Sequence, residues 1–154
     1  MGYKMKAIAA IMCGGRGSRM QLGQRIEKPL LKVNGRAIVD YVFDALAMSG
    51  RFESIVAAGS PNTSQTSGLL QAKGVKVIQT SGKGYHRDLS CLLEYLKPAT
   101  IFVVPADLAL LTFQVVRDIF SIFTLMSFAA GPSIRSKSPP AISVICLLYT
   151  SPSP

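Results

Sequence analysis

The chain has 154 residues, of which 49% are hydrophobic, and a formal charge of +9. This length and apolar content suit one packed domain and exclude a disordered chain. The three cysteines have no CxxC or Cys/His spacing, which excludes a disulfide scaffold and a zinc site and favours a reducing compartment. The apolar stretch 119–130 is too short to cross a bilayer. We therefore expect a cytoplasmic protein without a membrane partner.

The positive charge is concentrated in the first quarter of the chain. Residues 1–36 contain a single acid, Glu27, and eight basic residues: Lys4, Lys6, Arg16, Arg19, Arg25, Lys28, Lys32 and Arg36. Such a patch binds nucleic acid, an anionic membrane or a polyphosphate ligand. Here the charges flank glycines and lack the interleaved aromatic residues of strand-stacking RNA binders. The pattern predicts a polyphosphate ligand and no nucleic acid.

The apolar periodicity predicts alternating strands and helices. Residues 6–12 form a continuous apolar run, typical of a strand buried on both faces, and residues 37–48 repeat apolar side chains at helical spacing. The same criteria predict strands at 55–58, 75–78, 100–104 and 141–145, and helices at 64–73, 85–96 and 112–126. This alternation indicates an α/β fold with a Rossmann-like, doubly wound, mostly parallel sheet, whose ligands bind beyond the carboxyl ends of the strands.

A glycine-rich loop with basic residues follows the first predicted strand. Residues 14–20 read GGRGSRM, and Lys28-Pro29 follows eight residues later. Glycines without Cβ atoms allow backbone N–H groups to approach phosphate oxygens, and Arg16, Arg19 and Lys28 supply countercharge. Met20 stands where a dinucleotide fingerprint has its third glycine, and no GxxxxGK[ST] P-loop is present. A plain tight turn is the alternative interpretation.

Three separate segments carry a family resemblance that extends over about residues 6–108. GGRGSRM (14–20) and EKPLLKV (27–33) resemble the signature of the MobA-like nucleotidyltransferases. SPNT (60–63) and TSGKGY (80–85) are similar to segments of the archaeal adenosylcobinamide-phosphate guanylyltransferases within that family. The resemblance implies a nucleotide-diphospho-sugar transferase-like fold and an enzyme that uses Mg²⁺ to transfer GMP from GTP to adenosylcobinamide phosphate, releasing pyrophosphate.

The same residues are also compatible with two other functions. A molybdenum-cofactor guanylyltransferase shares the glycine loop, although SPNT and SGKGY favour the cobamide substrate. A nucleotide-binding module without catalysis is the alternative from a different class. The resemblance implies small-molecule substrates and leaves a homodimer open.

The resemblance also implies roles for individual residues. Arg19 and Lys28 would neutralise charge on the pyrophosphate and the α-phosphoryl oxygens, and Asp107, after the strand at 100–104, would hold Mg²⁺. The nucleotide would be bound at the phosphates by Gly14, Gly15, Arg16, Gly17 and Ser18, and at the base and ribose by Ser60, Asn62, Thr63, Ser81, Gly82, Lys83 and Gly84. Each role has a structural alternative: a surface lysine for Lys28, a helix cap for Asp107, and turn chemistry for Asn62 and Lys83-Gly84.

The last nine residues, 146–154, do not fit the pattern. One back-translation of CLLYTSPSP, tgtctcttatacacatctccgagccca, resembles the end of a transposon-based sequencing adapter. We expect a truncated domain over residues 1–145 and an artefactual or disordered tail over 146–154; a natural Ser/Pro tail is the alternative. Because the relatives are longer and place a further acidic ligand and much of the acceptor site in their C-terminal part, we expect this chain to bind GTP with little turnover.

Overall fold

A parallel five-stranded sheet forms the centre of the described part of the molecule. The computed structural model describes residues 7–14, 26–96, 100–129 and 143–146. In spatial order the strands are β5 (Lys76–Gln79), β4 (Ser54–Gly59), β1 (Ala7–Met12), β6 (Thr100–Pro105) and β7 (Ser143–Cys146). All four neighbouring pairs are parallel. The predicted α/β fold with a parallel sheet is confirmed.

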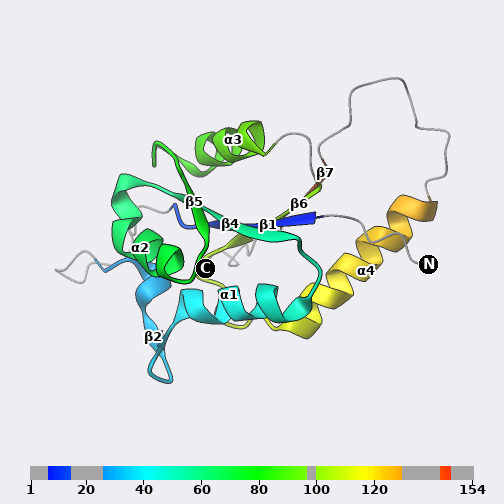
Figure 1. Ribbon diagram of the computed structural model, residues 1–154, viewed down its shortest axis with the longest axis horizontal. Coiled ribbons are helices and arrows are strands. Elements are labelled where there is room, and N and C mark those ends of the chain that lie inside the picture. Colours follow the sequence, from blue (N-terminus) through cyan, green and yellow to red (C-terminus); the bar gives the residue numbers. More distant parts are fainter. Residues whose placement is uncertain (1–6, 15–25, 97–99, 130–142, 147–154) are drawn as a thin grey trace, which may run out of the picture.

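Helices cover both faces of this sheet. α1 (Ile38–Ser49), α2 (Ser64–Ala72) and α4 (Phe113–Ala129) pack on one face, and α3 (Tyr85–Tyr95) lies on the other (Figure 1). Successive residues of β6 alternate between the two layers because a strand points neighbouring side chains to opposite faces. Phe102 is buried with Leu46 and Val116 in the first layer, whereas Val103 is buried with Leu92 in the second.

β1 is the middle strand, and its sequence suits that place. The segment AIAAIM is buried along almost its whole length, as expected for a strand with neighbours on both sides and helices on both faces. Met12 pairs with Ala58 of β4 and with Pro105 of β6, so three strands end at the same level. Their carboxyl ends form one edge of the sheet, on the left of Figure 1.

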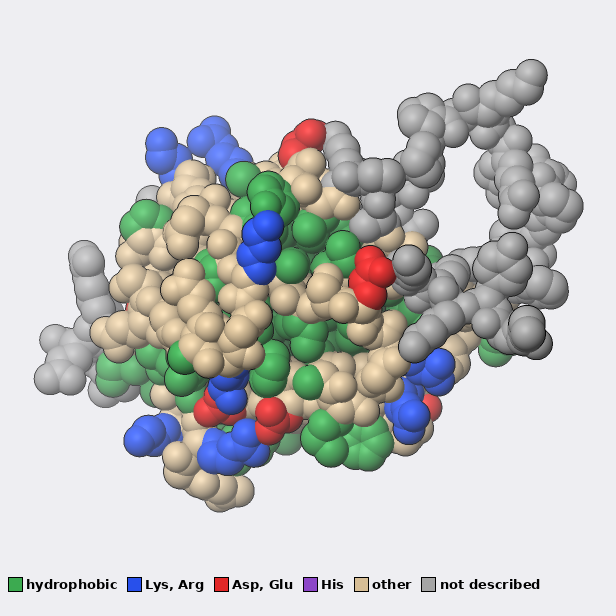
Figure 2. All heavy atoms as spheres, viewed as in Figure 1, with side chains coloured by type: hydrophobic (Ala, Val, Ile, Leu, Met, Phe, Trp, Pro, Cys, Tyr) green, Lys and Arg blue, Asp and Glu red, His purple; other side chains and the backbone are tan. Residues whose placement is uncertain are grey.

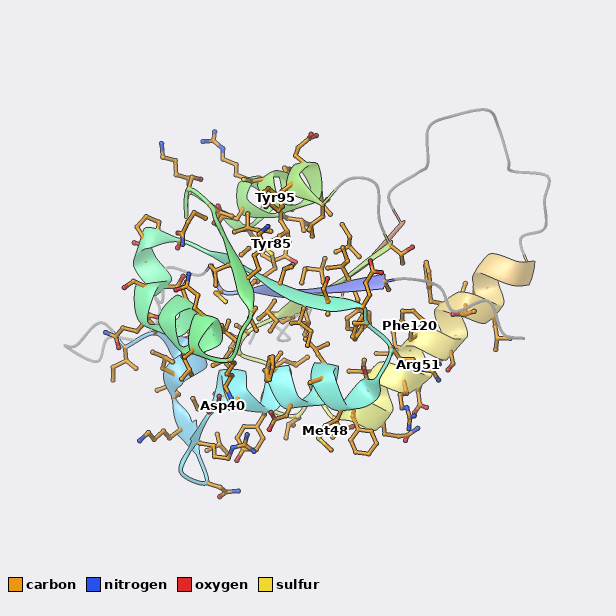
Figure 3. All side chains as sticks on the ribbon, viewed as in Figure 1. Asp40, Met48, Arg51, Tyr85, Tyr95 and Phe120 are labelled. Carbon is orange, nitrogen blue, oxygen red and sulfur yellow. The ribbon has the colours of Figure 1, made fainter. Side chains whose placement is uncertain are left out.

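Aromatic packing holds α4 against the sheet. Phe120, labelled in Figure 3, points from α4 toward the strands and is 5% exposed. The Phe52 ring lies in the same layer between α4 and the sheet, with its centroid 5.9 Å from that of Phe120 and 5.4 Å from that of Phe102. In the described part of the chain, no helix combines the length and apolar character that a bilayer span requires.

All the predicted strands and helices are present, with small shifts at their ends. α4 continues three residues beyond the predicted end, to Ala129, and β7 ends at Cys146, one residue beyond the predicted domain. Residues 147–154, the rest of the expected tail, lie outside the described residues.

The sequence analysis missed a short hairpin. β2 (Lys32–Val33) and β3 (Arg36–Ala37) form a short antiparallel hairpin. Its turn residues Asn34 and Gly35 have φ of 50° and 79°, the left-handed conformation that two-residue hairpin turns require. The Asn-Gly dipeptide was the signal that could have identified it. Around this hairpin and α1, basic and acidic side chains lie next to each other (Figure 2), and they include the ion pair between Arg36 and Asp44.

Candidate functional site

Loops that follow four strands begin side by side at the carboxyl edge of the sheet. Backbone hydrogen bonds continue the strand pairing past the strand ends: Cys13 N–H donates to the Ala58 carbonyl at 3.0 Å, and Ala106 N–H donates to the Met12 carbonyl at 3.0 Å. Thr80 N–H donates to the Gly59 carbonyl at 2.7 Å. These bonds bring the loops after β1, β4, β5 and β6 together, where a doubly wound sheet binds its ligands.

The structure describes only the start of the glycine-rich loop. Gly14 follows β1 directly at this edge. Gly15, Arg16, Gly17, Ser18 and Arg19 lie outside the described residues, so their phosphate contacts stay predictions.

Lys28 returns to the same edge in the short 3-10 helix η1 (Lys28–Leu30). Pro29 is buried, and Lys28 is partly buried. Within the described part of the chain, the Lys28 ammonium makes no ion pair or hydrogen bond. A partly buried cation without a partner among the described residues suits the binding of an anionic ligand.

Glu27, which the sequence analysis did not assign to the site, holds the Lys28 segment in place. Its carboxylate accepts hydrogen bonds from the backbone N–H groups of Gln65 (3.0 Å) and Thr66 (2.7 Å) and from the Thr66 hydroxyl. These N–H groups belong to the first turn of α2, which has no helical acceptors for them. Glu27 therefore caps α2 across a separation of 38 residues, and the sequence offers no local signal for that contact.

Removal of this cap should destabilise the protein. We expect Glu27→Ala to lower the free energy of unfolding by about 1–3 kcal/mol, because hydrogen bonds to a charged group are lost and helix N–H groups lose their acceptor. Urea denaturation measures the change. Glu53→Ala is the matched control, since Glu53 is exposed and an exposed substitution costs within about 0.5 kcal/mol. Equal losses in the two variants would contradict the role of Glu27.

The SPNT segment forms a self-capped turn after β4. Ser60 Oγ accepts a hydrogen bond from Asn62 N–H at 3.3 Å, and Thr63 Oγ1 accepts one from Ser60 N–H at 3.1 Å. Ser60 and Thr63 are each 2% exposed. The polar atoms of Ser60 and Thr63 therefore hold the loop together, and Asn62 is the exposed polar side chain that the turn presents.

The SGKG segment after β5 packs directly against this turn. Gly82 has φ of +65°, and a Cβ atom there would lie 2.9 Å from Ser60 Cβ and 3.0 Å from Asn62 Nδ2. Both the backbone conformation and the space require glycine. The two segments that the resemblance assigns to base and ribose are thus in contact. Lys83 is exposed beside them, and Gly84 precedes α3.

Asp107 follows β6 at the same edge and is exposed. It does not cap the next helix: α4 begins at Phe113, and Thr112 Oγ1 accepts the hydrogen bond from Val115 N–H at 3.3 Å. The described residues donate no hydrogen bond to the Asp107 carboxylate. A free carboxylate here fits Mg²⁺, which takes one or two protein carboxylates together with substrate phosphates and water. No group of three or more His, Cys, Asp or Glu residues in the described ranges surrounds a metal position.

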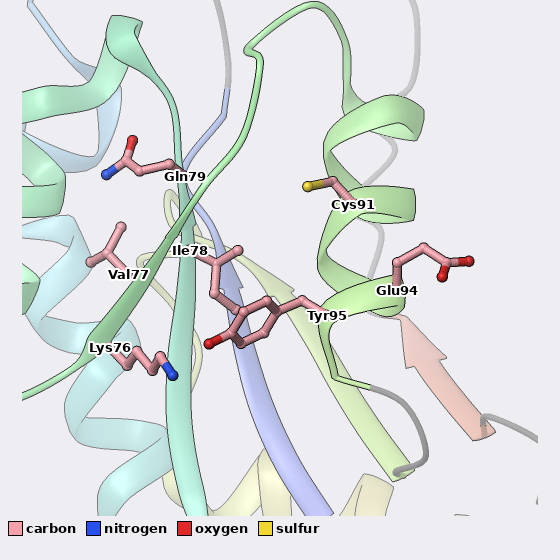
Figure 4. A pocket seen from close by; sticks show the side chains of 7 residues that line it. All are labelled: Lys76, Val77, Ile78, Gln79, Cys91, Glu94 and Tyr95. Carbon is pink, nitrogen blue, oxygen red and sulfur yellow. The ribbon is translucent and has the colours of Figure 1, made fainter.

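Two cysteines differ sharply in their surroundings. Burial and, to a smaller extent, the charge of Glu27 raise the pKa of the Cys13 thiol to about 12. Cys91 is exposed on α3 and points into a groove between α3 and β5 (Figure 4). This groove lies over a face of the sheet, where the Lys76 ammonium sits 4.9 Å from the Tyr95 ring centre, and not at the carboxyl edge.

We expect iodoacetamide at neutral pH to modify Cys91 and to leave Cys13 unmodified in the folded protein. The reactive species is the thiolate, and the raised pKa keeps Cys13 protonated as well as buried. Peptide mass spectrometry after timed labelling reports both sites, and labelling in denaturant is the control that makes Cys13 reactive. Fast labelling of Cys13 in the folded state would contradict its burial at the end of β1.

Comparison with known proteins shows the family of this chain. Residues 9–143 match the MobA-like NTP transferase domain family. The chain belongs to this family. It is also 39% identical over 121 residues to the adenosylcobinamide-phosphate guanylyltransferase of Methanocaldococcus jannaschii, a match that covers 75% of this chain and 59% of that protein. The chain thus spans less than two thirds of the length of this curated relative.

Solved structures share the fold of this MobA-like domain. The CMP:2-keto-3-deoxy-manno-octonic acid synthetase complexed with CTP matches with a TM-score of 0.62 and 18% identity, over 83% of this chain and 49% of that chain. Rv0371c from Mycobacterium tuberculosis H37Rv matches with a TM-score of 0.65 and 15% identity, over 93% of this chain and 89% of that chain. At these identities the similarity concerns the fold alone.

Proposed function

We propose that this MobA-like domain transfers GMP from GTP to adenosylcobinamide phosphate, as the name of its Methanocaldococcus jannaschii relative states for that protein. The structural observation that carries the proposal is the contact of Gly82 with Ser60 and Asn62 at the edge that also holds Gly14. A base-binding surface formed by these two segments would lie beside the loop that begins at Gly14, whose backbone would bind the phosphates. We also propose that the protein acts in the cytoplasm, because its cysteine pattern suits a reducing compartment.

In the proposed reaction, a phosphate oxygen of adenosylcobinamide phosphate attacks the α-phosphorus of GTP. The bond from the α-phosphorus to the bridging oxygen breaks, and pyrophosphate leaves with the electron pair. No covalent bond to the protein forms, so the protein contributes alignment and charge neutralisation.

The residues of this chain would share these tasks. Lys28 and Arg19 would neutralise charge that develops on the pyrophosphate and on the α-phosphoryl oxygens. Asp107 would hold Mg²⁺, which when bound supplies positive charge to the phosphate oxygens. The glycines of the first loop would bind phosphate oxygens through backbone N–H groups, and Asn62 with the SGKG loop would contact base and ribose.

Nucleotide preference tests the guanylyl part of the proposal. In calorimetric titration with Mg²⁺ we expect GTP to bind more tightly than ATP, because a site built for the donors of guanine leaves polar groups unpaired with adenine. Equal affinities would leave a nucleotidyltransferase-type site without guanine selectivity.

Product formation tests the transfer itself. The chain is incubated with GTP, Mg²⁺ and adenosylcobinamide phosphate while pyrophosphate is measured, with the Methanocaldococcus jannaschii enzyme as the positive control. Adenosylcobinamide-GDP formed by the chain supports the transferase. Product from the control alone would agree with the expected GTP binding with little turnover and would restrict this chain to nucleotide binding.

A further inference from the structure

Asp88 is a buried carboxylate next to the candidate site, and it has no part in the proposed reaction described above. It lies in the first turn of α3, the helix whose start is marked by Tyr85 in Figure 3, and it is 2% exposed. Carboxylates are almost never fully buried unless they have partners. Asp88 Oδ1 accepts hydrogen bonds from Gly82 N–H at 3.0 Å and from the Ser81 hydroxyl at 3.4 Å. The side chain therefore closes the SGKG loop onto α3.

The second oxygen of Asp88 reaches a different loop. A Cβ atom at Gly14 would lie 2.9 Å from Asp88 Oδ2, closer than real Cβ atoms approach a neighbour. The hydrogen bonds of Oδ1 already hold the SGKG loop on α3, and they do not require Oδ2 to lie close to Gly14. Gly14 follows β1, whereas Gly82 follows β5, and β4 lies between these strands. Asp88 thus connects two loops whose strands are not neighbours.

The contacts continue to a third loop. On its other side Gly82 packs against Ser60 and Asn62, which follow β4. Gly14, Asp88, Gly82 and Asn62 therefore form one continuous series of contacts, from the start of the phosphate loop to the exposed amide proposed for the base. Gly14 and Asn62 are thus linked through the side chain of Asp88, in addition to the backbone hydrogen bonds that join their strands.

We infer that Asp88 is a positioning residue that sets the spacing between the phosphate-binding loop and the base-binding loops, so that one guanosine triphosphate engages both at once. This inference rests on the proposed function and extends it. Asp88 acts through Gly14 and Gly82 and makes no contact with the nucleotide. Its removal should therefore weaken ligands that span the loops far more than ligands that engage one of them.

Binding of whole and partial ligands tests this spacing role. We expect Asp88→Ala to weaken GTP binding at least about tenfold, because the SGKG loop loses its hydrogen bonds to a charged acceptor and with them its fixed place, and to change the binding of inorganic tripolyphosphate less than about threefold. Asp88→Asn, which retains an oxygen for Gly82 N–H and the same shape against Gly14, should bind GTP within about threefold of the wild type. Asp118→Ala, at an exposed carboxylate on α4, is the control.

The opposite results would overturn the inference. Unchanged GTP binding by Asp88→Ala, or an equal loss for GTP and tripolyphosphate, would show that Asp88 does not set the spacing. If Asp88→Ala fails to fold by circular dichroism, Asp88→Leu, which has a similar shape and no acceptor, replaces it. Failure of both to fold would assign Asp88 to folding alone and reject the spacing role.

A double-mutant cycle tests the Gly14 contact without any ligand. Gly14→Ala should lower the thermal midpoint in the wild-type background and lower it much less in the Asp88→Ala background, because the clashing oxygen is then absent. Equal shifts in both backgrounds would reject the contact. If the cycle shows this coupling but the wild type binds no GTP, both the proposed function and the nucleotide role of Asp88 are rejected. If the wild type binds GTP and Asp88→Ala leaves that binding unchanged, only the inference is rejected.

Discussion

Lys28→Ala is expected to weaken GTP binding at least about tenfold, since loss of a charged hydrogen-bond partner costs roughly 1.5–3 kcal/mol. The structure supports this expectation because η1 holds Lys28 partly buried at the carboxyl edge, with Glu27 fixed to α2 on one side and Pro29 buried on the other. Its ammonium makes no ion pair with the described residues. A triphosphate would supply the missing anion.

Calorimetric titration with GTP and Mg²⁺ measures the effect. Lys32→Ala is the matched control, because Lys32 is an exposed lysine of the β2–β3 hairpin only four residues away. It should change the affinity little, and its small effect would report the general contribution of positive charge. Equal losses in the two variants would show that Lys28 contributes only to the general field of the basic segment.

Asp107→Asn should abolish most of the dependence of GTP binding on Mg²⁺. We expect Mg²⁺ to tighten GTP binding by the wild type, and we expect this gain to fall at least about tenfold in the variant, because a neutral amide is a poor ligand for a hard cation. The substitution preserves the shape of a side chain that is exposed and free of hydrogen bonds from the described residues, so stability should change little.

Titrations in Mg²⁺ and in EDTA give the metal-dependent gain for each protein. Asp118→Asn is the control, since Asp118 is an exposed carboxylate of α4 whose described contact is a hydrogen bond from Gln114 on the same helix. It should keep the wild-type gain. If Asp107→Asn also keeps it, the Mg²⁺ ligand lies elsewhere, and the exposed Asp107 serves only the turn after β6.

The sequence by itself determined the order of strands and helices and the edge at which the site lies. The apolar run of β1 and the helical repeat of α1 are local patterns, and β–α alternation leads directly to a parallel sheet with its loops at one edge. The segments around Gly14, Asn62, Gly82 and Asp107 were located in the same way, because each follows a predicted strand, whereas their expected roles came from the family resemblance. The hairpin at Asn34 escaped this local reasoning, although its Asn-Gly turn is a local signal, and so did the short helix η1.

Only the tertiary structure decided how these segments hold one another. Glu27 caps a helix 38 residues away, and Asp88 lies with one oxygen on Gly82 and the other near the Cα of Gly14. Neither contact has a sequence pattern, because a carboxylate that accepts hydrogen bonds from backbone N–H groups depends on where the backbone goes and not on the partner's side chain. The sequence predicts which loops meet at the edge, whereas packing across non-neighbouring strands decides the distances between them.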